Sequence, residues 1–208
     1  MTTGLRRFIE PAPEPPPAAQ TPEPEERCEM CATPLAPEHG HVVDLENRSL
    51  LCACRPCYLL FTRDSAGRFR AVPDRVLYVA DRPLTAPEWE GLGIPVSEAF
   101  FLRGEDGVAA FYPSPAGATE CQLDLAAWAD LEREHPMLSD AASDVEAILV
   151  RSADEAIECF LVPIDACYEL VGTVRMYWKG FDGGAEARER IGAFYDRLRD
   201  RARPAPTS

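Results

Sequence analysis

Four cysteines, arranged as two Cys-x-x-Cys pairs, are the residues of this chain best suited to chemistry. The first pair is Cys28 and Cys31, in "CEMC", and the second is Cys54 and Cys57, in "CRPC". A Cys-x-x-Cys turn directs two sulfur atoms toward one point, and two such turns joined by a hairpin form a tetrahedral cage of thiolates. The 22 residues between the pairs are slightly more than the usual zinc-ribbon spacing. The pattern predicts a four-cysteine metal site.

Three neighbouring side chains are alternative ligands. Cys52 lies two positions before Cys54, so strand alternation would place both side chains on one face. We interpret Cys52 as a small buried residue beside the site, and its replacement of Cys54 as the alternative. His39 and His41, in "HGH", are also alternative ligands, although a polar turn at Gly40 is the preferred interpretation.

Zinc is the cofactor that this cysteine pattern favours. Iron or an iron–sulfur cluster is the alternative, because both also bind to four cysteine sulfurs. A zinc ion held by four thiolates has no open coordination position, so the site is expected to be structural. One tightly bound metal ion per chain is expected. A thioredoxin-type redox pair is disfavoured because it would stand alone before a helix.

The rest of the sequence contains no recognised catalytic arrangement. His135 is the one histidine outside the cysteine-rich segment. The glycine-containing loops at 114–120 and 181–186 lack the spacing of a nucleotide-binding fingerprint. Three further cysteines fall in positions typical of a protein core: Cys121, Cys159 and Cys167. The protein is therefore predicted not to be an enzyme.

Charge is unevenly distributed along the 208 residues, whose net charge is −14. Residues 28–72 hold five acidic and five basic side chains, whereas residues 73–153 hold fifteen acidic and five basic ones, a net charge of −10. Nucleic-acid binders need a basic surface, so no nucleic-acid partner is expected. An acidic surface instead suits a protein partner with an arginine- or lysine-rich face.

The distribution of apolar residues bears on localisation. No stretch approaches the roughly 18 apolar residues that span a membrane, and no apolar run follows the arginines of "MTTGLRRFIE". We therefore expect no membrane insertion and a cytoplasmic location. Thiols stay reduced there, which disfavours disulfides among the clustered cysteines.

The elements around these residues predict an α+β fold. A small four-cysteine, zinc-ribbon-like module is expected to precede an α+β domain with a mainly antiparallel sheet. The expected segments are a disordered Pro/Glu-rich tail at 1–27, the cysteine-rich module at 28–72, an acidic α+β domain at 73–203, and a disordered tail at 204–208.

Local patterns predict individual strands and helices. "HVVDL" and "RSLLCAC" predict one hairpin, and "CYLLF" and "RFRAV" a second, which would place the cysteines at 52–57 between two strands. "AFFLR" and "VAAFYPS" should pair around "GEDG", and "VEAILV" and "IECFLV" should be strands. Three aspartates are expected to cap helices: Asp124, Asp165 and Asp182. Two buried helical faces are expected, one with Leu125, Trp128 and Leu131, the other with Ile191, Phe194 and Leu198.

Several stretches of the chain resemble an uncharacterised actinobacterial family whose members are encoded beside the genes of high-affinity, oxygen-tolerant [NiFe]-hydrogenases. These stretches are "GHVVDLENRSLLCACRPCYLLFTRD", "AFYPSPAGATE" and "FLVPIDACYELVGTVRMYWKGFDGGAEARERIGAFYDRL". The resemblance covers roughly residues 28–200. It implies a non-enzymatic accessory protein that supports assembly, stability or function of a hydrogenase by contacting a hydrogenase subunit or maturation factor. The alternative function is a rubredoxin-like or iron–sulfur electron-transfer protein that uses the same cysteines.

Overall fold

The computed structural model describes residues 25–62, 67–78, 83–153 and 156–205. Most of the two predicted tails, at 1–27 and 204–208, lies outside these residues, as does most of "TRDSAG". Among the described helices, none is long and apolar enough to cross a membrane.

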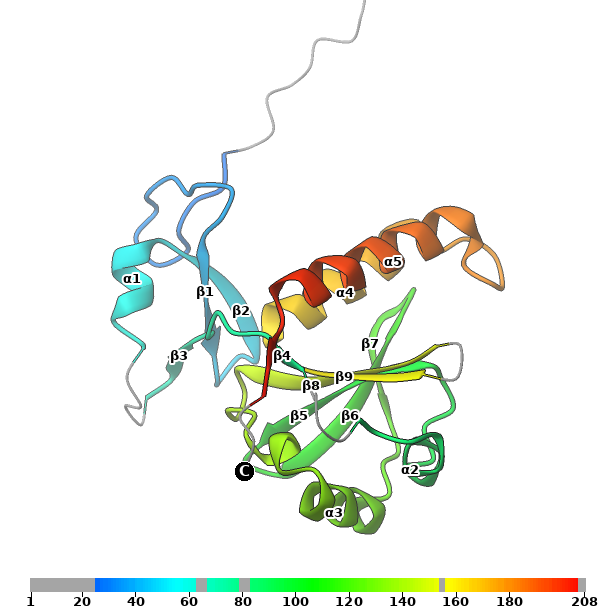
Figure 1. Cartoon of the computed structure of the whole chain (residues 1–208). Helices are drawn as coiled ribbons and strands as arrows, with labels where there is room; N and C mark the ends of the chain where they lie inside the picture. Colours follow the sequence, from blue (N-terminus) through cyan, green and yellow to red (C-terminus); the bar gives the residue numbers. More distant parts are fainter. Residues whose placement is uncertain (1–24, 63–66, 79–82, 154–155, 206–208) are drawn as a thin grey trace, which may run out of the picture.

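The described residues form two β-sheets, and the fold is α+β as predicted (Figure 1). The smaller sheet has the order β2-β1-β3, and both neighbouring pairs are antiparallel. Its strands are β1 (Gly40–Asp44), β2 (Ser49–Ala53) and β3 (Phe69–Ala71). Together with the close group of four cysteines, this hairpin-based sheet gives the zinc-ribbon-like module that the sequence predicts.

The larger sheet has seven strands in the order β10-β4-β9-β8-β5-β6-β7. Every neighbouring pair is antiparallel except β10 and β4, which are parallel. The mainly antiparallel sheet is therefore confirmed. Its strands are β4 (Leu77–Tyr78), β5 (Glu98–Gly104), β6 (Gly107–Ser114), β7 (Gly117–Cys121), β8 (Glu146–Ala153), β9 (Ala156–Pro163) and β10 (Arg203–Pro204).

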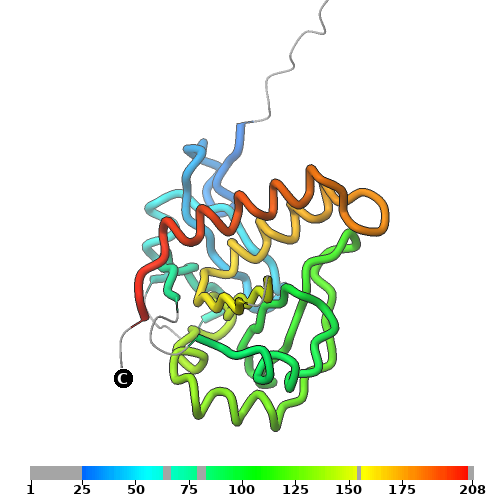
Figure 2. Tube along the Cα trace, turned by 45° about the vertical axis from the view of Figure 1, so that its right-hand side comes forward, coloured from blue at the N-terminus to red at the C-terminus, as the bar shows by residue number. Residues whose placement is uncertain are grey.

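Helices cover both faces of the larger sheet (Figures 1 and 2). The helices on one face are α2 (Ala86–Gly91) and α3 (Leu125–Glu134), which is followed by a 3-10 helix (Pro136–Ser139); those on the other are α4 (Ile164–Tyr177) and α5 (Gly184–Arg201). Strand alternation fills two cores. Phe100 and Leu149 pack with α4 and α5, whereas Phe101 and Ile148 pack with α2 and α3.

The small sheet packs onto the α4–α5 side of the larger one. Val43 of β1 and Val72 are buried in the same core as residues of α4 and α5. Arg70 adds an ion pair to Asp144, with 3.4 Å between Nη1 and Oδ2. The small sheet is therefore held against the larger sheet and its helices by both apolar and charged contacts.

The structure corrects the strand predicted for "CYLLF". Residues 57–59 of this stretch instead lie in a short helix, α1 (Arg55–Leu59). Tyr58 N donates a hydrogen bond to the carbonyl oxygen of Cys54, the residue before the helix, at 2.9 Å. Pro56 favours this first helical turn because its ring fixes φ near the helical value. The backbone N–H that proline lacks would have no partner in the first turn of a helix in any case. The second cysteine pair therefore spans the end of a strand and the start of a helix.

One of the three predicted aspartate caps is confirmed. Asp124 Oδ1 accepts hydrogen bonds from two backbone amides at the start of α3. The cap predicted at Asp165 is wrong, because this residue lies inside the first turn of α4 and binds His41 instead. The cap predicted at Asp182 is also wrong, because Gly183, with a φ of 80°, is the N-cap residue of α5 and Asp182 pairs with Arg188.

The predicted helical faces are largely correct. Ile191, Phe194 and Leu198 of α5 are buried as expected, and so are Trp128 and Leu131 of α3. Leu125 is 62% exposed, contrary to the prediction. It is the first residue of α3, directly after the N-cap residue Asp124.

Candidate metal centre

Four cysteine side chains of the small module converge on one point. The ligand atoms of Cys28, Cys31, Cys54 and Cys57 all lie within 4.8 Å of one another. The sulfur atoms of Cys31 and Cys54 are 3.6 Å apart. Four sulfurs bound tetrahedrally to zinc, at about 2.3 Å each, would be separated by about 3.8 Å. This arrangement could therefore hold one metal ion.

A tight backbone turn positions the first pair. Cys28 N donates a hydrogen bond to Thr33 O at 2.9 Å, and Ala32 N donates one to Cys28 O at 2.7 Å. Ala32 has a φ of 60°, in the left-handed region. The chain therefore reverses directly after Cys31 and returns alongside itself.

The second pair is positioned by β2 and α1. Cys54 is the N-cap residue of α1, and Cys57 lies in its first turn. Two hydrogen bonds join this segment to the first pair: Glu29 N donates to Cys52 O at 2.9 Å, and Cys52 N donates to Glu29 Oε2 at 2.6 Å. The two turns are therefore held together by contacts that do not involve the sulfurs.

The pKa values of Cys28 and Cys57 are shifted in opposite directions. Burial raises the pKa of Cys28, but backbone hydrogen bonds at Cys54, Met30 and Cys31 outweigh this and bring it to about 6. The neighbouring sulfurs, Cys54 foremost, raise the pKa of Cys57 to about 12. One thiolate thus suppresses ionisation of its neighbours, a repulsion that a bound cation would remove.

The alternative ligands lie in a different place. Cys52 is not among the four close cysteines but forms a second group with His39 and His41. The polar turn predicted at Gly40 is wrong, because Gly40 begins β1. A Cβ at Gly40 would lie 2.6 Å from Cδ2 of the Tyr58 ring, so this close approach requires glycine.

Core packing is observed for two of the three remaining cysteines. Cys159 and Cys167 are buried, whereas Cys121 is half-buried at the edge of the α2–α3 core. Sequence reasoning missed the role of Asp165, which was expected to cap a helix and instead lies against His41. The local sequence contains no signal for this contact, since the two residues are 124 positions apart.

A family described as "Family of unknown function (DUF5947)" matches residues 27–202. The chain belongs to this DUF5947 family. The match includes the cysteine module and every strand of the larger sheet except β10, so both sheets are parts of one DUF5947 unit. No curated protein and no solved structure matches the chain.

Proposed function

We propose that this DUF5947 protein is a non-enzymatic accessory protein whose four-cysteine site holds a structural zinc ion. The observation that carries the proposal is the group of four cysteine ligand atoms within 4.8 Å of one another. Four thiolates complete the tetrahedral shell of zinc and leave no position for a substrate. The ion would join the turn after Cys28 to the start of α1.

The energetic role of this zinc would be to fold the small module. A three-stranded sheet of short strands buries little apolar surface by itself. In small zinc fingers the metal contributes about 10–16 kcal/mol of apparent binding free energy, which is also folding free energy. Loss of one cysteine ligand should therefore unfold the module.

Metal content tests the proposal directly. Protein purified without a metal-affinity tag and dialysed exhaustively should retain one zinc ion per chain, measured by mass spectrometry of the element. Cys31→Ser and Cys57→Ser should each lose it. Cys121→Ser is the matched control, because Cys121 is also incompletely buried but lies in β7.

Two outcomes would contradict this assignment. Full occupancy in a Cys28→Ser, Cys31→Ser double variant would exclude the four cysteines as the ligands. A red or brown protein containing iron would instead support the rubredoxin-like or iron–sulfur electron-transfer alternative, since zinc thiolates are colourless.

We further propose that the larger domain acts by binding a protein. Residues 73–153 carry a net charge of −10, which suits a basic partner surface. The resemblance to proteins encoded beside [NiFe]-hydrogenase genes suggests a hydrogenase subunit or maturation factor as this partner.

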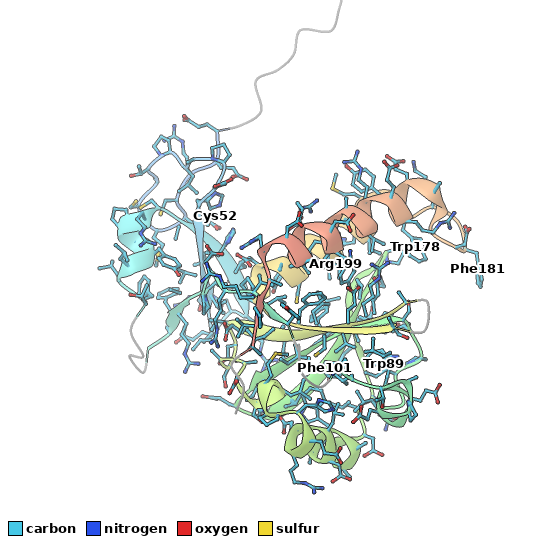
Figure 3. All side chains as sticks on the ribbon, viewed as in Figure 1. Cys52, Trp89, Phe101, Trp178, Phe181 and Arg199 are labelled. Atoms are coloured by element: carbon cyan, nitrogen blue, oxygen red, sulfur yellow. The ribbon has the colours of Figure 1, made fainter. Side chains whose placement is uncertain are left out.

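The loop between α4 and α5 supports this docking role. Phe181 is fully exposed at the loop, and Trp178 beside it is 37% exposed (Figure 3). Trp178 Nε1 donates a hydrogen bond to Gly180 O at 3.2 Å, and a Cβ at Gly183 would meet the Trp178 ring at 2.9 Å. The loop is thus closely packed against the Trp178 ring, and it presents Phe181 to solvent. Phenylalanine is a residue type enriched in protein interfaces.

Affinity purification from the native host tests the docking proposal. At low salt, hydrogenase components should copurify, and a several-fold increase in salt should weaken their recovery because surface charges are screened over about 8 Å at physiological ionic strength. Phe181→Ser should reduce recovery. Leu125→Ser, which changes an exposed leucine on the opposite helical layer, is the control. Absence of hydrogenase components, with turnover of a small molecule by the pure chain, would overturn the accessory role.

A further inference from the structure

Three ligand-type side chains outside the four-cysteine group converge beside it. One ligand atom from each of His39, His41 and Cys52 lies within 4.8 Å of the other two. The two imidazole rings have centroids 5.0 Å apart, and Cys52 faces His41 directly across the β1–β2 ladder. Cys52 lies on the small module at the side toward α4 (Figure 3).

The hydrogen bonding of His39 leaves one nitrogen ready to bind a cation. Nδ1 lies 3.0 Å from the carbonyl oxygen of Ala36, which can only accept, so Nδ1 carries the proton. Nε2 of the neutral ring therefore presents a lone pair. The His39 side chain is only 10% exposed, and its buried Nε2 has no hydrogen-bond partner among the described residues. Such unsatisfied buried polar atoms are rare and call for an explanation.

His41 is oriented in the same way by an acidic partner. Its Nδ1 lies 2.8 Å from Oδ2 of Asp165, in the first turn of α4. A carboxylate accepts this hydrogen bond, which leaves Nε2 of the neutral ring unprotonated. Metal-binding histidines are typically held by a carboxylate through their second nitrogen, which fixes the ring and raises its basicity.

We propose that His39, His41 and Cys52 form a second metal site, separate from the four-cysteine centre, for a borderline divalent cation of the zinc class. Two imidazoles and one thiolate are ligands that zinc prefers. Cys52 binds as the thiolate and releases its proton to solvent on metal binding. The fourth position is left for water or for a ligand from a partner. With one protein ligand fewer, this ion exchanges more readily than the zinc held by four cysteines.

Cobalt titration of the zinc-loaded protein tests this site. Co²⁺ is the probe because its visible bands report coordination geometry and its thiolate charge-transfer band reports a bound cysteine. Wild-type protein should bind one Co²⁺ per chain while the zinc of the four-cysteine centre stays in place, measured by native mass spectrometry. Charge transfer from one thiolate should accompany the tetrahedral bands.

Variants separate the second site from the first. Cys52→Ser should lose the charge-transfer band, and His41→Ala should weaken Co²⁺ binding at least about tenfold. Asp165→Asn should weaken it about 10–100-fold, the usual cost of losing an outer-shell partner. Cys121→Ser is the control and should bind as wild type does. Retention of the zinc in the four-cysteine centre of each variant shows that the module is folded.

The wild-type titration alone can overturn the proposal. It fails if no Co²⁺ binds to the zinc-loaded chain, or if Co²⁺ enters only by releasing an equal amount of zinc. It also fails if Cys52→Ser keeps the charge-transfer band. Failure of this second site would leave the proposed zinc of the four-cysteine centre standing, because that zinc is tested by the loss of metal in Cys31→Ser.

Discussion

At the scale of single residues, Ala32 has an unfavourable backbone conformation. Its φ of 60° closes the turn after Cys31 and lets its amide bind Cys28 O at 2.7 Å. An alanine in this region costs about 1 kcal/mol because its Cβ approaches the following carbonyl oxygen. This unfavourable conformation closes the turn that brings the sulfur atoms of Cys28 and Cys31 close together.

Replacing Ala32 by glycine should therefore stabilise the module. Ala32→Gly is expected to raise the free energy of unfolding by about 1 kcal/mol, measured by denaturant titration of the zinc-loaded protein. Ala36→Gly is the control, since Ala36 is not among the positive-φ residues, and it should be neutral or slightly destabilising. Equal destabilisation by both changes would show that the strain at Ala32 has no energetic weight.

Gly40 is required for a different reason, the close approach of Tyr58. The tyrosine ring lies 2.6 Å from a Cβ at Gly40, and its hydroxyl donates to Val72 O at 2.9 Å. Gly40→Ala should destabilise the protein by about 1–3 kcal/mol through overpacking. In a double-mutant cycle with Tyr58→Ala, the two effects should be clearly less than additive. Additive effects would place the origin of the cost elsewhere.

At the scale of elements, Glu88 links α2 to the end of α3. Its carboxylate accepts hydrogen bonds from the backbone amide and hydroxyl of Thr85, each at 2.7 Å, and lies 3.0 Å from His135 Nε2. Burial raises the pKa of Glu88, but the bonds to His135 and Thr85 outweigh this and lower it from 4.5 to about 2. The ionised form therefore stabilises the junction between α2 and the end of α3.

This shift predicts the pH dependence of stability. Because the folded-state pKa is depressed, the contribution of Glu88 is complete above the unfolded value and is lost as the pH falls through about 2. Glu88→Gln should cost about 2 kcal/mol at pH 7. The difference from wild type should shrink steadily below pH 4.5, measured by denaturation followed through the fluorescence of buried Trp89 and Trp128. A difference independent of pH would contradict the assignment.

Elements that depend on residues close in the chain were predicted from the sequence, whereas contacts between distant elements were not. Paired strands around "GEDG", the Asp124 cap and the Cys-x-x-Cys pairs depend on residues close in the chain, and local patterns predicted them. The helix α1 was mistaken for a strand because "CYLLF" is apolar enough for either, and Pro56 decides between them. The Asp165–His41 contact depends on how α4 docks, which no local pattern encodes.

At the scale of the whole molecule, the two sheets differ in what stabilises them. The core on the α2–α3 side is built from residues 77–205, whereas the core on the α4–α5 side also includes Val43 and Val72 of the cysteine module. Order in the module should depend on its metal. The larger sheet has apolar layers on both faces, so it should keep its structure without the ion.

Removal of the metal should therefore have a local effect. A strong chelator is expected to raise amide hydrogen exchange in β1 and β2 by several orders of magnitude, while β8 stays protected, measured by mass spectrometry. Exchange in α4 should rise slightly, because it loses its contacts with β1. Addition of zinc should restore protection. Simultaneous loss of protection in β8 would show that the two sheets unfold as one unit.

The hydrogen bond between His41 and Asp165 has a consequence for the order of events during synthesis. The four clustered cysteines lie within residues 28–57, whereas His41 meets a residue 124 positions later. N-terminal segments leave the ribosome first, and short loops close at a lower entropic cost than long ones. The module could thus bind its proposed zinc ion while the larger sheet is still being translated. The histidine of the second site, His41, is oriented only after α4 has emerged and docked. An ion bound at that site would therefore report that synthesis and folding have passed α4.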